Sequence, residues 1–266
     1  MDFEKNTFKK RFKSMMGVDF RRMLTSPLFY LMIGISIVMP ILILVMTSMM
    51  DGTVSVNPQT GEETIMQGFK NVWQMIGAVS GDGSNGMSMD LTSMCNINMM
   101  FFIIAVFVCV FVSDDFRSGY VKNLFTVRSK KDDYIVSKSI VCFVAGASMI
   151  LAFFIGSLLG GVFSGVSFSL QGVTVYNIIM TVFSKVFLVG IFIAIYLLAS
   201  VIAKEKLWLS LILSFGIGML FFTMVPLITP LNSTIVNALL CLVGSVLFGA
   251  GIGVGSYFVL KKTNIL

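Results

Sequence analysis

Residues 114–138 read DDFRSGYVKNLFTVRSKKDDYIVSK, a charged segment between two long apolar runs. This segment holds six of the 19 Lys and Arg residues of the chain. Apolar residues recur at helical spacing in its first half: Phe116, Tyr120, Val121, Leu124 and Phe125. Polar residues fall on the opposite side: Arg117, Ser118, Lys122 and Asn123. The pattern predicts a short amphipathic helix, held at a membrane surface between two spans, that docks onto something in the cytoplasm.

Composition indicates an integral membrane protein. Hydrophobic residues make up 56% of the chain and charged residues 12%, with a mean hydropathy of +0.93. A soluble domain carries about twice that charged fraction. The apolar runs are continuous over roughly 20 residues, which favours helices over the alternating strands of a barrel. The net charge of +6 comes from short segments beside the apolar runs, so it does not indicate a nucleic-acid partner.

We expect an all-α, polytopic protein with six transmembrane helices in a single domain over residues 1–266. The expected spans are 28–50, 94–112, 139–159, 175–203, 207–227 and 235–260. Basic residues gather in every second segment between them: the N-terminal segment, residues 113–138, the 204–206 turn and the tail. By the positive-inside rule, both termini and the 113–138 segment are cytoplasmic in the cell membrane.

Two further segments have helical patterns. Residues 1–27 are basic, with apolar residues on one side, which predicts a helix in the cytoplasmic interface, although Asp19 breaks the pattern. In the 51–93 loop, which we expect to be extracellular, apolar residues also fit one helical face: Ile65, Phe69, Val72, Trp73, Ile76 and Val79. This helix would be either a lid on the other spans or a contact for substrate, with Trp73 at the outer interface.

No catalytic constellation is present in the sequence. The chain has no His, its four Cys lack CxxC spacing, and no GxxxxGK[ST] loop occurs, so neither a metal site nor its own ATP site is expected. Inside a span, Lys185 would either snorkel to the outer headgroups or make a polar contact in a pathway. Pro226 and Pro230 bracket VPLITPLNS, either an outer gate or a turn. The span glycines favour helix packing within the chain over a dimer face.

Taken in order along its whole length, the chain resembles the membrane subunits of type-2 ABC transporters. The matching features are the basic N-terminal helix ending in SPLFYLM, six spans, a tail closing as FVLKKTNIL, and the 114–138 segment. That segment looks like the family pattern of an acidic residue, then G-x-x-K-N-L, a basic residue and a Lys leading into span three. Asp114 and Asp115 stand where Glu is common in the family. The size is most similar to the bacitracin- and lantibiotic-immunity branch of peptide-antibiotic exporters.

The resemblance implies a permease without an ATPase site, driven by a separate ABC subunit that binds ATP and Mg, in a two-plus-two assembly with a second copy or a paralogue. Residues 119–127 would be the coupling helix. The implied docking residues are Asp114, Asp115, Phe116, Arg117, Gly119, Tyr120, Lys122, Asn123, Leu124, Phe125 and Arg128. Of these, Phe116, Tyr120, Leu124 and Phe125 would pack either in a cleft of the partner or against the membrane-side helices. Lys204, Glu205 and Lys206 would make a second cytoplasmic contact. An amphipathic peptide or a lipid-like molecule would suit the apolar spans as substrate. A gradient-driven carrier and a non-transporting sensor or scaffold are the alternatives.

Overall fold

Long helices form most of the computed structural model, which describes residues 2–56, 63–65, 68–77, 95–127, 132–170, 172–222 and 224–262. Within those residues, five helices are long and apolar enough to cross a membrane. They are α2 (Pro27–Met50), α4 (Met100–Arg117, preceded by the 3-10 turn η2, Ile97–Met99), α6 (Asp132–Ser164), α7 (Val175–Ala203) and α10 (Ile235–Lys262). The protein is therefore a mainly helical, multi-pass membrane protein, as the composition predicts.

Three of the expected spans differ from the helices observed. The helix expected over 94–112 continues to Arg117 in α4. Residues 207–227 do not form one continuous helix: α8 (Leu207–Phe222) ends early and the short α9 (Val225–Ile228) follows. With 16 residues, α8 is about 24 Å long, less than the roughly 30 Å of a hydrocarbon core. In contrast, α6 begins seven residues before the expected span. Its first two turns are charged, but Asp133 and Lys138 are buried there with oppositely charged partners, so the helix continues beyond the apolar run.

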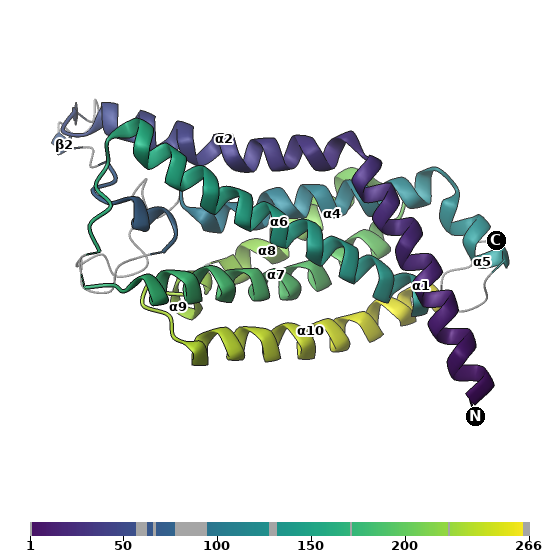
Figure 1. Cartoon of the computed structure of the whole chain (residues 1–266). Helices are drawn as coiled ribbons and strands as arrows, with labels where there is room; N and C mark the ends of the chain where they lie inside the picture. The colour runs from purple at the N-terminus through teal and green to yellow at the C-terminus, as the bar shows by residue number, and fades with distance from the viewer. Residues whose placement is uncertain are drawn as a thin grey trace.

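The bundle is built around α4 and α7. In each of these helices 67% of the most apolar stretch is buried, whereas in α10 the buried share is 11%. α7 is packed against α4, α6, α8 and α10, while α2 lies along α6 (Figure 1). α2 and α6 approach closely where Gly156 and Gly160 meet the backbone of residues 37–41. A Cβ on Gly156 would lie 2.3 Å from the Ile37 carbonyl oxygen, so the small residue is required for this contact.

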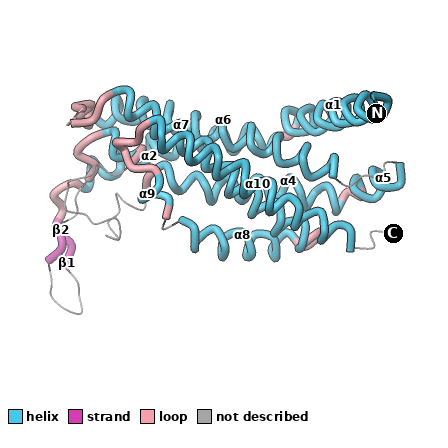
Figure 2. The backbone as a smooth tube through the Cα atoms, turned by 90° about the horizontal axis from the view of Figure 1, so that it is seen from below, coloured by secondary structure: helices cyan, strands magenta, loops and turns pink. Residues whose placement is uncertain are grey.

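The start of the first helix and the end of the last helix lie at the same end of the bundle. Figures 1 and 2 both place the start of α1 (Asp2–Thr25), the end of α10 and α5 (Tyr120–Val127) at this end, which we call the basic end. The opposite end, the hairpin end, carries β1 (Val54–Val56) and β2 (Glu63–Ile65), which pair antiparallel with Val54 opposite Ile65. Ser26 separates α1 from α2, and α1 packs against α6.

The helix expected within residues 51–93 is wrong. Ile65 lies in β2, and Val72–Met75 form a single 3-10 turn, η1, with Asn71 and Gln74 in a capping box; Val79 lies outside the described residues. Four apolar side chains of this segment are nevertheless buried inside the protein: Phe69, Val72, Met75 and Ile76. The indole nitrogen of Trp73 donates to the Phe168 carbonyl oxygen at 3.1 Å in the α6–α7 connection. The described part of this segment is therefore packed against the bundle at the hairpin end, as the lid interpretation expects.

Candidate functional site

A tight turn sets α5 apart from α4 at the basic end. α4 ends at Arg117, where the Ser118 amide donates to the Asp114 carbonyl oxygen at 2.9 Å. Gly119 follows with φ of +73°, the left-handed conformation that commonly ends a helix and that glycine adopts without strain. Tyr120 then starts a new helix of eight residues. The turn thus presents α5 beyond the end of the bundle (Figure 1).

α5 has one buried and one exposed side. Val121 is buried, and Tyr120, Leu124 and Phe125 are half-buried against the core of the bundle. The Phe125 ring meets the Tyr134 ring of α6 edge-on, with 5.9 Å between centroids. On the other side, Lys122, Asn123 and Thr126 are exposed. The predicted amphipathic helix is therefore present, with its polar side free of contacts from this chain's core.

A group of charges lies directly behind α5; three of its members are fully buried and the fourth, Arg22, is 31% exposed. We call it the charge cluster: Asp19 and Arg22 of α1, Asp115 of α4 and Lys138 of α6. The Lys138 Nζ lies 2.9 Å from Asp19 Oδ1 and 2.7 Å from Asp115 Oδ2. Arg22 Nη1 donates to Asp115 Oδ1 at 2.6 Å. Three helices that are distant in sequence are thereby joined by ion pairs.

Neutral donors complete the coordination of the two carboxylates. Tyr134 Oη donates to Asp115 Oδ2 at 2.9 Å, and Ser137 Oγ donates to Asp19 Oδ2 at 2.6 Å. Two acids then face two bases, so the cluster carries no net charge. This balance matters because a buried charge left without a partner costs several kcal/mol, on the order of 3–5. The cluster should hold its helices in one fixed arrangement.

Arg22 connects the cluster to α5. Its guanidinium carbon lies 4.3 Å from the centroid of the Tyr120 ring, a cation–π contact. Burial by itself lowers the pKa of Arg22, but the Asp115 carboxylate outweighs burial, so this pKa is raised and Arg22 stays charged. Burial also raises the pKa of Tyr120, which keeps its phenol neutral. A further ion pair, Arg11 Nε to Asp133 Oδ2 at 3.6 Å, joins α1 to the start of α6.

The residues expected to dock a partner divide into two groups. Asp114, Arg117, Lys122 and Asn123 are exposed at the basic end. Asp115 and Phe116 are not available to a partner: Asp115 is fully buried in the charge cluster, and Phe116 is 6% exposed in the last turn of α4. Phe116 also does not share a helix with Tyr120, because the turn at Gly119 separates them. Arg128 lies outside the described residues.

The turn between α7 and α8 is fully exposed. Lys204, Glu205 and Lys206 are all at the surface, and Lys204 has a left-handed φ of +53°. Below the turn, the hydroxyls of Ser200 and Ser210 lie 2.8 Å apart and connect the two helices. The turn is therefore an accessible, firmly held loop of the kind expected for a second contact.

Lys185 does not snorkel. It is fully buried in α7, where its ammonium donates to Asn98 Oδ1 at 2.7 Å and to Thr229 Oγ1 at 3.0 Å. Asn98 belongs to η2, and Thr229 follows α9 directly. The snorkelling interpretation is wrong because the η2 turn and the segment after α9 enclose the side chain. The polar-contact interpretation agrees with this geometry.

Pro226 and Pro230 lie in the same region and are half-buried. Pro226 falls in the first turn of α9, where a missing amide proton costs nothing. The Pro230 carbonyl oxygen is 3.0 Å from the Thr181 hydroxyl of α7. The broken segment is thus anchored to α7 at Thr181 and Lys185, one helical turn apart. Over the residues that the structure describes, no three His, Cys, Asp or Glu side chains are grouped as metal ligands.

Comparison with known proteins identifies the family of the chain. The sequence model of the ABC-2 family transporter proteins matches residues 20–221, about three quarters of the chain. No curated protein and no solved structure gives a significant match. The matched range includes the charge cluster, α5, the α7–α8 turn and Lys185. The chain belongs to the ABC-2 transporter family and is a membrane permease of an ABC transporter.

Proposed function

We propose that the protein is the membrane-spanning subunit of an ATP-driven exporter and that α5 is its coupling helix. Family membership implies an ATP-binding partner. The observation that carries the proposal is the placement of α5: a short helix with an exposed polar side, presented beyond the bundle and braced behind by buried charges. A separate ABC subunit, which binds ATP and Mg, would form contacts with Asp114, Arg117, Lys122, Asn123 and Arg128.

The charge cluster gives α5 a route into the membrane helices. Arg22 contacts Tyr120 of α5 and pairs with Asp115 of α4, which in turn pairs with Lys138 of α6. Because breaking a buried ion pair is costly, displacement of α5 would move these helices together instead of deforming the turn. Lys204, Glu205 and Lys206 would make the second contact with the same partner.

At the hairpin end, Lys185, Pro226 and Pro230 are proposed as parts of an outer gate. Lys185 connects the start of α4 with the segment after α9 through two hydrogen bonds. Rocking of the helices by ATP-driven closure of the partner would separate these segments and open the outer end.

The remaining assignments follow the resemblance and the charge distribution. Six crossings, including the short α8, with both termini in the cytoplasm would place the basic end beside the ATPase. Two permease chains, identical or paralogous, would combine with two ATPase subunits. The substrate would be an amphipathic peptide or a lipid-like molecule, in keeping with the similarity to the bacitracin- and lantibiotic-immunity branch.

The docking claim is tested by reversing two exposed charges, Arg117→Glu together with Lys122→Glu. Charge-assisted contacts contribute about 1.5–3 kcal/mol each, so export should fall by about tenfold or more. ATP hydrolysis should persist without export. The measurement is export of a dansyl-labelled amphipathic peptide, with hydrolysis, in proteoliposomes that contain the permease and its ATPase.

The matched control is Lys10→Glu with Lys13→Glu, which changes the same charge on exposed positions of α1. This control should export normally. Normal export by the α5 double variant would exclude docking through these residues. Export that an ionophore abolishes and that continues without the ATPase would instead indicate a gradient-driven carrier.

A further inference from the structure

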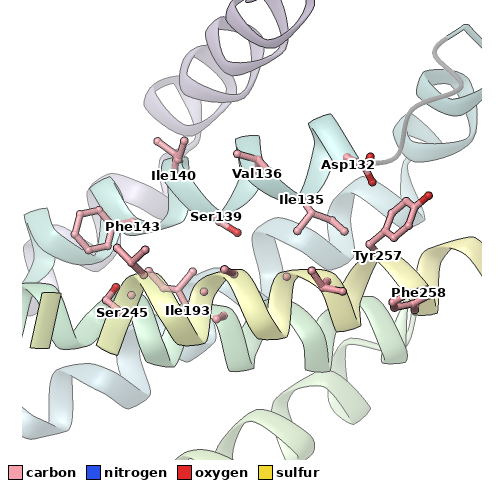
Figure 3. A pocket seen from close by; sticks show the side chains of 17 residues that line it. Asp132, Ile135, Val136, Ser139, Ile140, Phe143, Ile193, Ser245, Tyr257 and Phe258 are labelled. Atoms are coloured by element: carbon pink, nitrogen blue, oxygen red, sulfur yellow. The ribbon is translucent and has the colours of Figure 1, made fainter. Parts of the chain in front are cut away.

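An apolar groove runs along the outside of the bundle between α6 and α10, with α7 as its floor. Its volume is about 860 Å³, within the range of about 300–1,000 Å³ of ligand sites. Figure 3 shows Asp132, Tyr257 and Phe258 at one end of the groove and Phe143 and Ser245 at the other. Most of the remaining lining is aliphatic or glycine.

Glycines keep the groove open along α10. A Cβ on Gly249 would meet no atom within 4 Å, and a Cβ on Gly253 would meet Ile135 only at 4.0 Å. These two positions therefore border empty space, in contrast to Gly190 of α7, whose Cβ would lie 1.8 Å from Ser245 Oγ. Side chains at 249 and 253 would fill the groove without disturbing the packing of the bundle.

The dimensions of the groove fit a chain thinner than a helix. From Ser245 to Phe258, α10 rises about 20 Å, so the stated volume gives a mean cross-section of about 43 Å². A helix with its side chains is about 10 Å wide or more, which needs close to twice this area. The length slightly exceeds half of a hydrocarbon core, about 15 Å. An extended acyl chain of one leaflet has about this length and, being thinner than a helix, fits within this cross-section.

Charges at the basic end select the headgroup. Lys261 and Lys262 are exposed one turn beyond Tyr257 and Phe258, so they continue the side of α10 that lines the groove. Asp132 opposes them with a single negative charge in the first turn of α6, where the helix dipole offsets part of it. The local charge is therefore positive at the mouth and absent along the groove.

We propose that the α6–α10 groove binds an anionic phospholipid, with an acyl chain over Gly249 and Gly253 and the phosphate beside Lys261 and Lys262. Basic positions between membrane helices are typical headgroup sites. The site is separate from α5 and from the outer gate, so it does not depend on the proposed export function.

The experiment uses the delipidated full-length permease in neutral detergent and native mass spectrometry. Dioleoyl phosphatidylglycerol should bind at one site with about 30-fold preference over dioleoyl phosphatidylcholine, since each lysine beside an anionic headgroup contributes roughly fivefold. Gly249→Leu with Gly253→Leu should lower phosphatidylglycerol binding by at least about tenfold, because the side chains occupy the chain's place.

The matched control is Gly251→Leu, at an exposed position of the same helix whose Cβ also meets nothing within 4 Å and which does not line the groove. It should bind lipid as the unmodified protein does. Lys261→Gln with Lys262→Gln should remove the preference between the two lipids and, being at the surface, tests the headgroup independently of helix packing. Three outcomes would overturn the proposal. They are unchanged lipid binding by the double leucine variant, equal binding of both lipids by the unmodified protein, and a dimer of the unmodified protein that the double leucine variant no longer forms.

Discussion

Lys185 is a buried cation with two oxygen partners, and within the described residues no carboxylate lies at ion-pair distance from it. Lys185→Met removes the charge at similar length. The change removes the cost of burying an ammonium but leaves Asn98 Oδ1 without its donor, so the unfolding temperature should change little. It also deletes the connection between η2 and the segment after α9. The outer end should therefore open more often although the protein is not less stable.

This prediction is measured by thiol labelling at Leu231→Cys, which is 1% exposed beside the broken segment. The background is Cys95→Ser, since Cys95 is half-buried close to η2. Labelling should accelerate about tenfold in the Lys185→Met variant, as expected for loss of about 1.5 kcal/mol or more from a charged hydrogen bond. Lys70→Met, which removes an exposed lysine from the hairpin end, serves as control. An unchanged labelling rate would exclude Lys185 as part of a gate.

At the scale of single residues, the sequence pattern shows where a charged residue interrupts an apolar face, but it does not show which residue pairs with it. Asp19 interrupts the apolar side of α1, and that interruption is visible in the sequence. Its partner Lys138 lies 119 residues away, a distance that periodicity does not bridge. The resemblance assigns Asp115 and Phe116 to the docking surface, and Phe116 also fits the helical period of Tyr120. The left-handed Gly119 ends that period, so both residues belong to α4, where they are buried.

At the scale of elements, the charge cluster should behave as one unit joining α1, α4 and α6. Lys138→Met leaves Asp19 and Asp115 with Arg22 as the one remaining base, and should lower the free energy of unfolding by about 3–5 kcal/mol. Adding Asp19→Asn restores equal charge, because Asp115 keeps Arg22 at 2.6 Å. The double variant should regain more than half of the loss. Thermal unfolding in detergent measures both.

Lys122→Met, which removes an exposed lysine from the neighbouring α5, should leave the unfolding temperature unchanged. If the double variant is no more stable than Lys138→Met alone, the cluster is not a balanced unit. In that case the lysine would act through its contact with the Phe111 ring, whose centroid is 4.1 Å from the ammonium.

The sequence pattern predicts which residues are buried better than it predicts the backbone conformation or which helices are in contact. Phe69, Val72 and Ile76 fit a helical face and are indeed buried, yet the Asn71 cap and the strand pairing of Ile65 give another backbone. Glycine spacing shows the same limit. Gly156 and Gly160 bring α2 and α6 together, while Gly251 and Gly255 have the same spacing and no neighbour within 4 Å. Spacing indicates that close approach is possible, and the facing helix decides whether it occurs.

For the whole molecule, the sequence predicts most of the architecture, because long apolar runs must become helices in a membrane. The start of α1, the end of α10 and α5 share one end of the bundle, which agrees with an even number of crossings (Figures 1 and 2). The helix limits differ from the prediction at 207–227, where a proline-broken segment ends the helix, and at the start of α6, where buried ion pairs extend it. Hydropathy along the sequence reveals neither effect.

The orientation of the bundle follows from charge and can be tested with two matched cysteines. Lys70→Cys and Lys122→Cys each replace an exposed lysine, one at the hairpin end and one on α5. The background is Cys95→Ser, because the other three cysteines are buried. A membrane-impermeant maleimide should label position 70 in intact cells and position 122 only after the membrane is opened, because the basic segments stay on the cytoplasmic side. The reverse labelling would place α5 outside the cell, where no ATPase could reach it, and would refute the coupling-helix assignment together with the orientation.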